Sequence, residues 1–130
     1  MTATLRISDL AEGILAFGLA DLLEILGEAA VKSTWRCEVG EFVPKPGVKY
    51  LREAWDAMAV VDGAILFQVA ANTLQVCSGR FEAFATGSPH PWLTLEAFES
   101  TWWEITSTDE DTLLAIEPCF KSVERIERAE

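Results

Sequence analysis

His90 is the only histidine of the chain, and the residues around it raise the question of catalysis first. It lies in the run Ser88-Pro89-His90-Pro91, where the serine hydroxyl is a candidate nucleophile and the imidazole a candidate general base. A working pair also needs a group that orients the imidazole ring, and the run supplies no acid for that role. The two prolines favour an exposed turn, so we assign no catalytic residue.

Three cysteines offer thiol or metal chemistry. Cys37, Cys77 and Cys119 are odd in number, far apart and set among apolar neighbours. Such cysteines are typical of reduced residues in the core of a cytosolic protein. A zinc site that also used His90 would need closely spaced ligand pairs, and the sequence has no Cys-x-x-Cys or His-x-x-His motif. We therefore expect no metal at these residues.

The acids Asp109, Glu110 and Asp111 could bind a cation, but the Asp-x-Asp-x-Asp-Gly loop of calcium sites is absent. A helix start explains them better. Ser107 with Glu110, or Thr108 with Asp111, can form a capping box, and acids in a first turn complement the helix dipole. The sequence also lacks a glycine-rich phosphate loop, so we expect neither a metal nor a cofactor.

The net charge of −11 over 130 residues narrows the classes of partner. Residues 1–94 hold 11 acids and 7 bases, whereas residues 95–130 hold 10 acids and 3 bases. Nucleic acids and anionic membranes attract basic stripes, and none is present, whereas a basic protein would be steered towards the acidic end. Acidity alone would also permit a nucleic-acid mimic. Asp9 and Glu12 interrupt any signal peptide, and no apolar run of about 20 residues exists, so we expect a cytoplasmic protein without a membrane segment.

The N-terminal region predicts a helix that Ser8 caps and that begins at Asp9. Gly18 is a weak point in this helix, and Asp21 with Glu24 forms a second capping pair. The segment is therefore either one helix or two short ones. One apolar stripe of the predicted helix holds Leu15, Leu19, Leu22 and Leu26.

The next elements follow from alternation and helical spacing. Residues 31–39 alternate between apolar and polar side chains, which predicts a half-buried strand. Two prolines and a glycine in 44–50 predict a loop. Apolar residues recur at i, i+3, i+4 and i+7 from Leu51, so 48–59 is predicted to be a helix.

Residues 60–72 allow two interpretations. Asp62-Gly63 could turn a hairpin, or Asp62 could cap a helix that runs to about Ala71. We prefer the helix because alanines favour it. Residues 73–85 are then predicted to form a strand with a bulge at Ser78-Gly79.

After a turn at 86–91, residues 92–106 predict a strand pair or one long bent strand. Odd positions are the apolar ones, so Trp103 should lie in the core. Even positions mix aromatic and polar side chains, so Trp102 should lie on the opposite face with Trp92, Phe98 and Glu104. A tight turn at Glu99-Ser100 would weaken this parity for the first half of the segment.

The chain is then predicted to form a helix that ends before Pro118 and a charged edge strand at 121–127. The run Glu99–Val123 contains E-S-x-W-W-E-I, S-x-D-E-x-x-L-L and F-K-S-V, and it resembles the C-terminal part of small uncharacterised bacterial α+β proteins. The resemblance covers about a fifth of the chain. It implies a strand, a capped helix and a strand, and it carries no function.

These patterns predict one α+β domain over residues 1–130, with a mainly antiparallel sheet of 4–5 strands and 3–4 helices. The first functional hypothesis is an interaction or regulatory domain, such as a toxin-neutralising protein. Its basic partner, or a second copy of the chain, would bind Trp92, Phe98, Trp102 and Glu104, unless a helix covers that face.

Two further functions remain open. A small-molecule domain would have its pocket between sheet and helices, lined by Trp35, Trp55 and Phe67. An enzyme has the least support, because the sequence offers neither a nucleophile with its base nor a set of metal ligands.

Overall fold

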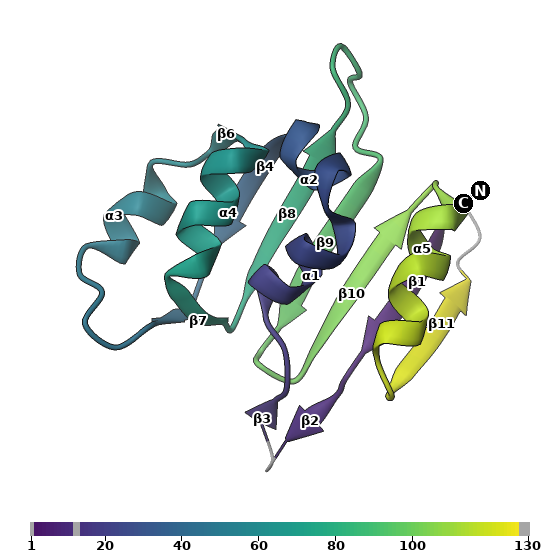
Figure 1. Ribbon diagram of the computed structural model, residues 1–130, viewed down its shortest axis with the longest axis horizontal. Coiled ribbons are helices and arrows are strands. Elements are labelled where there is room, and N and C mark those ends of the chain that lie inside the picture. The colour runs from purple at the N-terminus through teal and green to yellow at the C-terminus, as the bar shows by residue number, and fades with distance from the viewer. Residues whose placement is uncertain (1, 12–13, 128–130) are drawn as a thin grey trace.

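The computed structural model describes residues 2–11 and 14–127, and its central element is a large antiparallel sheet (Figure 1). The strand order is β11-β1-β10-β9-β8-β4-β6. Two short ribbons lie outside this sheet: β2 (Leu10–Ala11) pairs with β3 (Ile14–Leu15), and β5 (Phe42–Pro44) pairs with β7 (Thr73–Val76). The seven strands of the large sheet are β1 (Ala3–Ile7), β4 (Thr34–Val39), β6 (Val60–Asp62), β8 (Gly79–Phe84), β9 (Leu93–Phe98), β10 (Trp102–Ser107) and β11 (Val123–Glu127).

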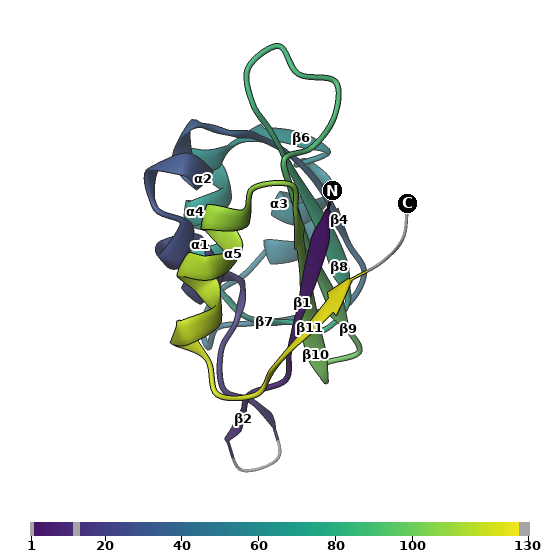
Figure 2. The same cartoon turned by 90° about the vertical axis from the view of Figure 1, so that its right-hand side faces the viewer.

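Helices cover one face of the sheet (Figure 2). In that view α1, α2, α4 and α5 stand on the same side, and Figure 1 shows α3 at the left, next to α4. Within the described residues none of the helices is long and apolar enough to cross a membrane. The helices are α1 (Leu19–Leu26), α2 (Glu28–Lys32), α3 (Leu51–Asp56), α4 (Gly63–Ala71) and α5 (Glu110–Ile116), with the short 3₁₀ helix η1 (Glu117–Cys119) after α5.

The α+β class and the mainly antiparallel sheet are confirmed, but the predicted numbers of elements were too low. The described chain has seven strands in the sheet rather than 4–5, and five α-helices rather than 3–4. One added strand is β1, which lies outside every predicted element. Its pairing with both β10 and β11 joins the two ends of the chain within the sheet.

The predicted strand at 73–85 divides in two. β7 belongs to a ribbon and β8 to the large sheet, and the break falls at Cys77 and Ser78. Both of these residues donate their backbone N–H to the carbonyl of Glu41, at 2.8 and 3.1 Å. The predicted bulge is therefore the point where the chain leaves one sheet for another.

The predicted helix start at Asp9 is wrong. The Asp9 carboxylate instead accepts the backbone N–H groups of Lys121 and Ser122, with Oδ2 2.8 Å from Lys121 N. The first helix begins ten residues later, and the backbone N–H of Gly18 donates to Asp21 Oδ2 at 2.8 Å. The alternative of two short helices divided near Gly18 is also wrong, because the strands β2 and β3 occupy described residues before Gly18. The structure divides the helical segment at Gly27 instead, and α2 takes up residues 28–32, where the next strand was expected to begin.

The segment 60–72 follows the preferred interpretation after residue 62. Residues 60–62 form the edge strand β6, which pairs with β4 and not across a hairpin at Asp62-Gly63. The preferred helix then follows as α4, with Asp62 immediately before it. The helix α3 is shorter than predicted and starts after Tyr50, whose backbone is left-handed with φ 63°.

The strands β9 and β10 form the predicted pair, and the turn between them preserves the parity of their side chains. Glu99 and Ser100 have left-handed φ angles of 47° and 60°. Three residues separate the strands, so Phe98 lies directly opposite Trp102 and even positions remain opposite even positions. The odd positions are the core, as predicted: Leu93, Leu95, Ala97, Trp103 and Ile105 are all buried.

The C-terminal elements follow the prediction closely. The helix α5 begins beyond Asp109, whose carboxylate accepts the N–H of Asp111 at 3.1 Å and the hydroxyl of Thr112 at 2.8 Å. Ser107 accepts the N–H of Asp109 at 2.9 Å. Capping therefore explains the acids, although through Asp109 rather than through either expected box. The last strand, β11, is an edge strand of the sheet.

Candidate functional site

One face of the large sheet carries no helix within the described ranges, and we call it the outer face (Figure 2). Strand alternation sends the odd-numbered residues of the central strands into the core, so the even-numbered ones face outwards. The residues of the outer face on its five central strands are Thr4, Arg6, Thr34, Arg36, Glu38, Arg80, Glu82, Phe84, Thr94, Glu96, Phe98, Trp102, Glu104 and Thr106.

The strand register arranges these side chains in rows across the sheet. One row is charged throughout, and the next contains three threonines, of which Thr4 and Thr106 have hydroxyl oxygens 2.9 Å apart. Neighbouring charges in the first row are mostly opposite in sign, which stabilises the pairing of the strands. In strand order the charged row is Glu124, Arg6, Glu104, Glu96, Arg80 and Glu38.

Every arginine of the outer face is bound to a carboxylate. On these five strands four acids stand beside three arginines, so one carboxylate, that of Glu38, is in excess. Arginines that are already paired offer little attraction to an anion, so this surplus carboxylate sets the sign of the surface. The pairs are Arg6 Nη2 with Glu104 Oε2 at 3.1 Å, Arg80 Nη1 with Glu96 Oε1 at 3.1 Å, and Arg36 Nη1 with Glu82 Oε1 at 3.9 Å.

An aromatic stack stands at one end of the outer face. The rings of Phe98 and Trp102 have centroids 5.3 Å apart and planes 16° from parallel. The Arg6 guanidinium lies 5.1 Å from the centroid of the Trp102 ring, and the indole Nε1–H donates to Glu104 Oε2 at 3.2 Å. The aromatic, cationic and anionic groups therefore form one connected cluster, in which Glu104 is 8% exposed.

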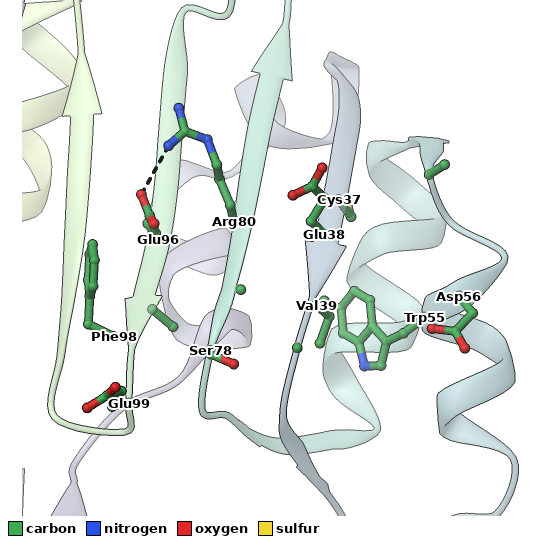
Figure 3. Close-up of a pocket in the computed structure, with 14 residues that line it drawn as sticks. Cys37, Glu38, Val39, Trp55, Asp56, Ser78, Arg80, Glu96, Phe98 and Glu99 are labelled. Carbon is green, nitrogen blue, oxygen red and sulfur yellow. Dashed lines mark hydrogen bonds and ion pairs between the residues drawn. The ribbon is translucent and has the colours of Figure 1, made fainter.

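A shallow hollow of about 820 Å³ lies beside this stack, between β4, β8, β9 and α3 (Figure 3). Figure 3 shows the Phe98 ring edge-on at one side of the hollow, Glu99 below it and Asp56 on the opposite side. Small residues form part of its lining, among them Gly40, Ser78, Gly79 and Ala97. The charged and aromatic residues that line it include Glu38, Asp56, Arg80, Glu96, Phe98 and Glu99.

The carboxylates of the hollow differ in their partners. Asp56 Oδ1 is 3.2 Å from Arg52 Nη1, and Glu96 is bound to Arg80. Glu38 and Glu99 are exposed, and neither forms an ion pair with any residue in the described part of the chain. These two carboxylates are therefore free to bind a cation from outside the molecule.

The structure separates the residues that the sequence grouped as a partner surface. It brings Phe98, Trp102 and Glu104 together. Trp92 precedes the opposite end of β9, and its Nε1–H donates to the hydroxyl of Ser33 at 2.9 Å. Trp92 therefore lies about 20 Å from Phe98 along the strand, outside the aromatic stack.

The residues predicted to line a small-molecule pocket do not share one hollow. Trp35 is fully buried, and its Nε1–H donates to the carbonyl of Ala30 at 2.9 Å. Trp55 borders the hollow near Phe98, but its Nε1–H donates to Thr73 Oγ1 at 3.2 Å. Phe67 is half-buried on α4. The Nε1–H groups of both indoles therefore donate hydrogen bonds within the protein.

The other candidates for chemistry are apart from one another. His90 lies in an exposed turn, where the Ser88 hydroxyl donates to its backbone carbonyl at 3.1 Å. Burial raises the pKa of the Cys37 thiol to about 12, Cys77 is half-buried and Cys119 is exposed. Across the residues that the structure describes, no group of three or more His, Cys, Asp or Glu side chains is placed to hold a metal ion.

Several participants of the site were missed from the sequence, among them Arg6, Glu38 and Glu99. Arg6 contributes through β1, an unpredicted strand, and its pairing with Glu104 depends on contact between residues far apart in the chain. Glu38 was placed on the polar face of its strand, but only the register of β4 with β8 brings it beside the hollow. Comparison of the chain with protein-family models, curated proteins and solved structures finds no match in any of the three.

Proposed function

We propose that this chain is a cytoplasmic, single-domain interaction protein that binds a basic protein partner through the outer face of its sheet, in a regulatory or toxin-neutralising role. One observation carries the proposal: the face without helices presents the stacked rings of Phe98 and Trp102 beside Glu38 and Glu99, which form no ion pair among the described residues. Aromatic residues surrounded by polar ones are the usual anchors of protein interfaces.

Charge favours a basic protein over a second copy of the chain. Each copy has a net charge of −11, so two outer faces would repel one another when brought together. A basic partner would be attracted at long range and would meet the carboxylates of Glu38 and Glu99 at short range. The partner therefore has a positively charged contact surface.

Small-molecule binding has less support. The predicted pocket residues Trp35 and Trp55 hydrogen-bond within the protein and do not line a common hollow. The hollow beside Phe98 is shallow and open, whereas small-molecule sites usually enclose most of the ligand.

The proposal is tested by capture from native lysate with three forms of the immobilised protein. The wild type is compared with Glu38→Lys/Glu99→Lys, which reverses the free charges of the hollow. The control is Glu24→Lys/Glu117→Lys, which makes the same change of net charge at exposed acids on α1 and η1.

We expect a basic protein to be retained by the wild type and the control, lost from the hollow variant, and released by high salt. Recovery of no protein by the wild type would count against the proposal. Equal capture by all three forms would also overturn it, because binding would then not involve the outer face.

A further inference from the structure

We infer that the hollow beside Phe98 binds an arginine side chain of the partner, with its guanidinium stacked on the free side of the Phe98 ring. This inference rests on the proposed function and specifies what its partner must present. The protein already makes the same kind of contact three times among its described residues.

Arginine lies over an aromatic ring at three places in the described chain. Arg6 lies 5.1 Å from the Trp102 centroid, and its guanidinium is bound to Glu104. In each of the other two places the arginine also has a carboxylate partner. Arg36 lies 5.2 Å from Phe84 and pairs with Glu82, and Arg52 lies 4.5 Å from Phe42 and pairs with Asp56.

Phe98 has the same surroundings without the arginine. Trp102 stacks on its ring, and Phe98 also lines the hollow, at one side of which Figure 3 shows the ring edge-on. Glu38 and Glu99 line the same hollow without a cationic partner among the described residues. The hollow therefore has an aromatic ring and carboxylates, as the three internal contacts do. Among the described residues, no arginine lies over the Phe98 ring.

The floor of the hollow allows a flat group to approach. Gly40 and Ser78 lie on neighbouring chain segments, and a Cβ on Gly40 would come within 2.5 Å of the serine hydroxyl oxygen. That hydroxyl accepts the backbone N–H of Glu41 at 2.9 Å, which fixes its position. Small side chains here leave the Phe98 ring open from the side of β8.

The geometry favours arginine over lysine. A guanidinium is planar, so it can stack on a ring while its five N–H donors reach carboxylates at the rim. An ammonium is a compact, strongly hydrated charge that gains less from the ring. The hollow is also too open to hold a free small cation tightly, so we commit to a side chain carried by a protein.

The inference is tested by NMR titration of the full chain with N-acetyl-arginine amide, at constant ionic strength. The matched probes are N-acetyl-lysine amide and N-acetyl-citrulline amide, which remove the guanidinium shape and the charge respectively. The protein variants are Glu38→Gln/Glu99→Gln, Phe98→Leu and the control Glu24→Gln/Glu117→Gln.

We expect saturable shifts at the amides of Gly40, Ser78 and Glu99 with the arginine probe, and weaker binding of the lysine probe. The hollow variant should weaken arginine binding about fivefold, as expected for the loss of two solvent-exposed ion pairs. Phe98→Leu should reduce the preference for arginine over lysine, and the control should bind as the wild type does.

Shifts of equal size with lysine, or shifts spread over all acidic surfaces, would overturn the inference. The two proposals fail separately. Loss of partner capture in Glu38→Lys/Glu99→Lys without arginine selectivity would retain the proposed function and remove the arginine site. Selective arginine binding without any captured partner would retain the arginine site and remove the proposed function.

Discussion

The rings of Phe98 and Trp102 stack directly across the hairpin of β9 and β10, with centroids 5.3 Å apart. Trp103, the next residue, points to the other side of the sheet, where it is fully buried and its ring stacks against Phe81 at 6.1 Å. Two adjacent indoles thus serve different layers, because neighbouring side chains of a strand point to opposite faces. One anchors the core and the other helps to form the outer face.

Substitution of the two tryptophans should therefore have unequal effects on stability. We expect Trp103→Ala to lower the free energy of unfolding by about 3–5 kcal/mol, because it opens a cavity in the core. Trp102→Ala should cost about 1–2 kcal/mol, from partial burial and the lost stack with Phe98. Urea unfolding measures both values.

A control separates packing from hydrogen bonding in this comparison. Within the described chain the buried Trp103 Nε1–H has no hydrogen-bond partner, so Trp103→Phe loses no such bond and keeps part of the ring packing. It should cost less than half of the alanine change. Equal losses for Trp102→Ala and Trp103→Ala would contradict the assignment of the two rings to different layers.

The pair of Arg6 and Glu104 should couple energetically. Arg6 donates to Glu104 Oε2 through both Nε and Nη2, at 3.3 and 3.1 Å, and Glu104 is nearly buried. We expect Glu104→Gln to lower the free energy of unfolding by about 1–2 kcal/mol, since Arg6 is partly exposed and screening reduces the effect. A double-mutant cycle with Arg6→Met should give a coupling above about 0.5 kcal/mol, and additive single losses would refute it.

The sequence predicted best where local pattern and tertiary contacts agree. Alternation placed Trp103 in the core and Trp102 outside, and the turn at Glu99 and Ser100 did not disturb it, because its three residues keep even positions opposite one another. The acids at 109–111 were correctly assigned to a helix start. These features depend on neighbours within a few residues.

Prediction from the sequence failed where contacts between distant segments determine the secondary structure. The five residues of β1 become a strand because β10 and β11 pair on either side of them. Asp9 reads locally as the start of a helix, but its carboxylate is used to bind the turn at Lys121 and Ser122. The contribution of Arg6 to the outer face required β1, so it could not be found from local pattern.

Two of the three cysteines, Cys37 and Cys119, should differ in reactivity. Burial raises the pKa of Cys37 to about 12, so at pH 8 it has almost no thiolate, which is the reactive form. Cys119 is exposed. We expect iodoacetamide to label Cys119 in the native protein and Cys37 only after denaturation in urea, as measured by mass spectrometry of peptides. Labelling of Cys37 as fast as Cys119 in the native protein would contradict the buried position.

The link between α5 and β11 should respond to acid. A hydrogen bond from Arg125 lowers the pKa of Glu110 from its ordinary value of 4.5. A carboxyl group whose pKa is lower in the folded state than in the unfolded state stabilises the fold at pH values above its ordinary pKa. This stabilisation is lost as the pH falls through the lowered pKa. NMR titration of the Glu110 carboxyl should show Arg125→Gln raising its pKa towards 4.5. An unchanged pKa would show that the hydrogen bond does not form in solution.

Gly63 should be the glycine least tolerant of a side chain, because α4 begins there in contact with the end of α2. A Cβ at this position would collide with the carbonyl oxygen of Ala30 and lie 2.6 Å from that of Val31, and backbone atoms cannot rotate away as side chains do. We expect Gly63→Ala to lower the free energy of unfolding by about 3 kcal/mol, the upper part of the range for overpacked sites.

Gly47→Ala is the matched control: its φ of +84° is left-handed, but no atom lies within 4 Å of the added carbon, so only about 1 kcal/mol should be lost. Urea unfolding of both variants decides the matter, since equal losses would mean that α2 and α4 can move apart at little cost.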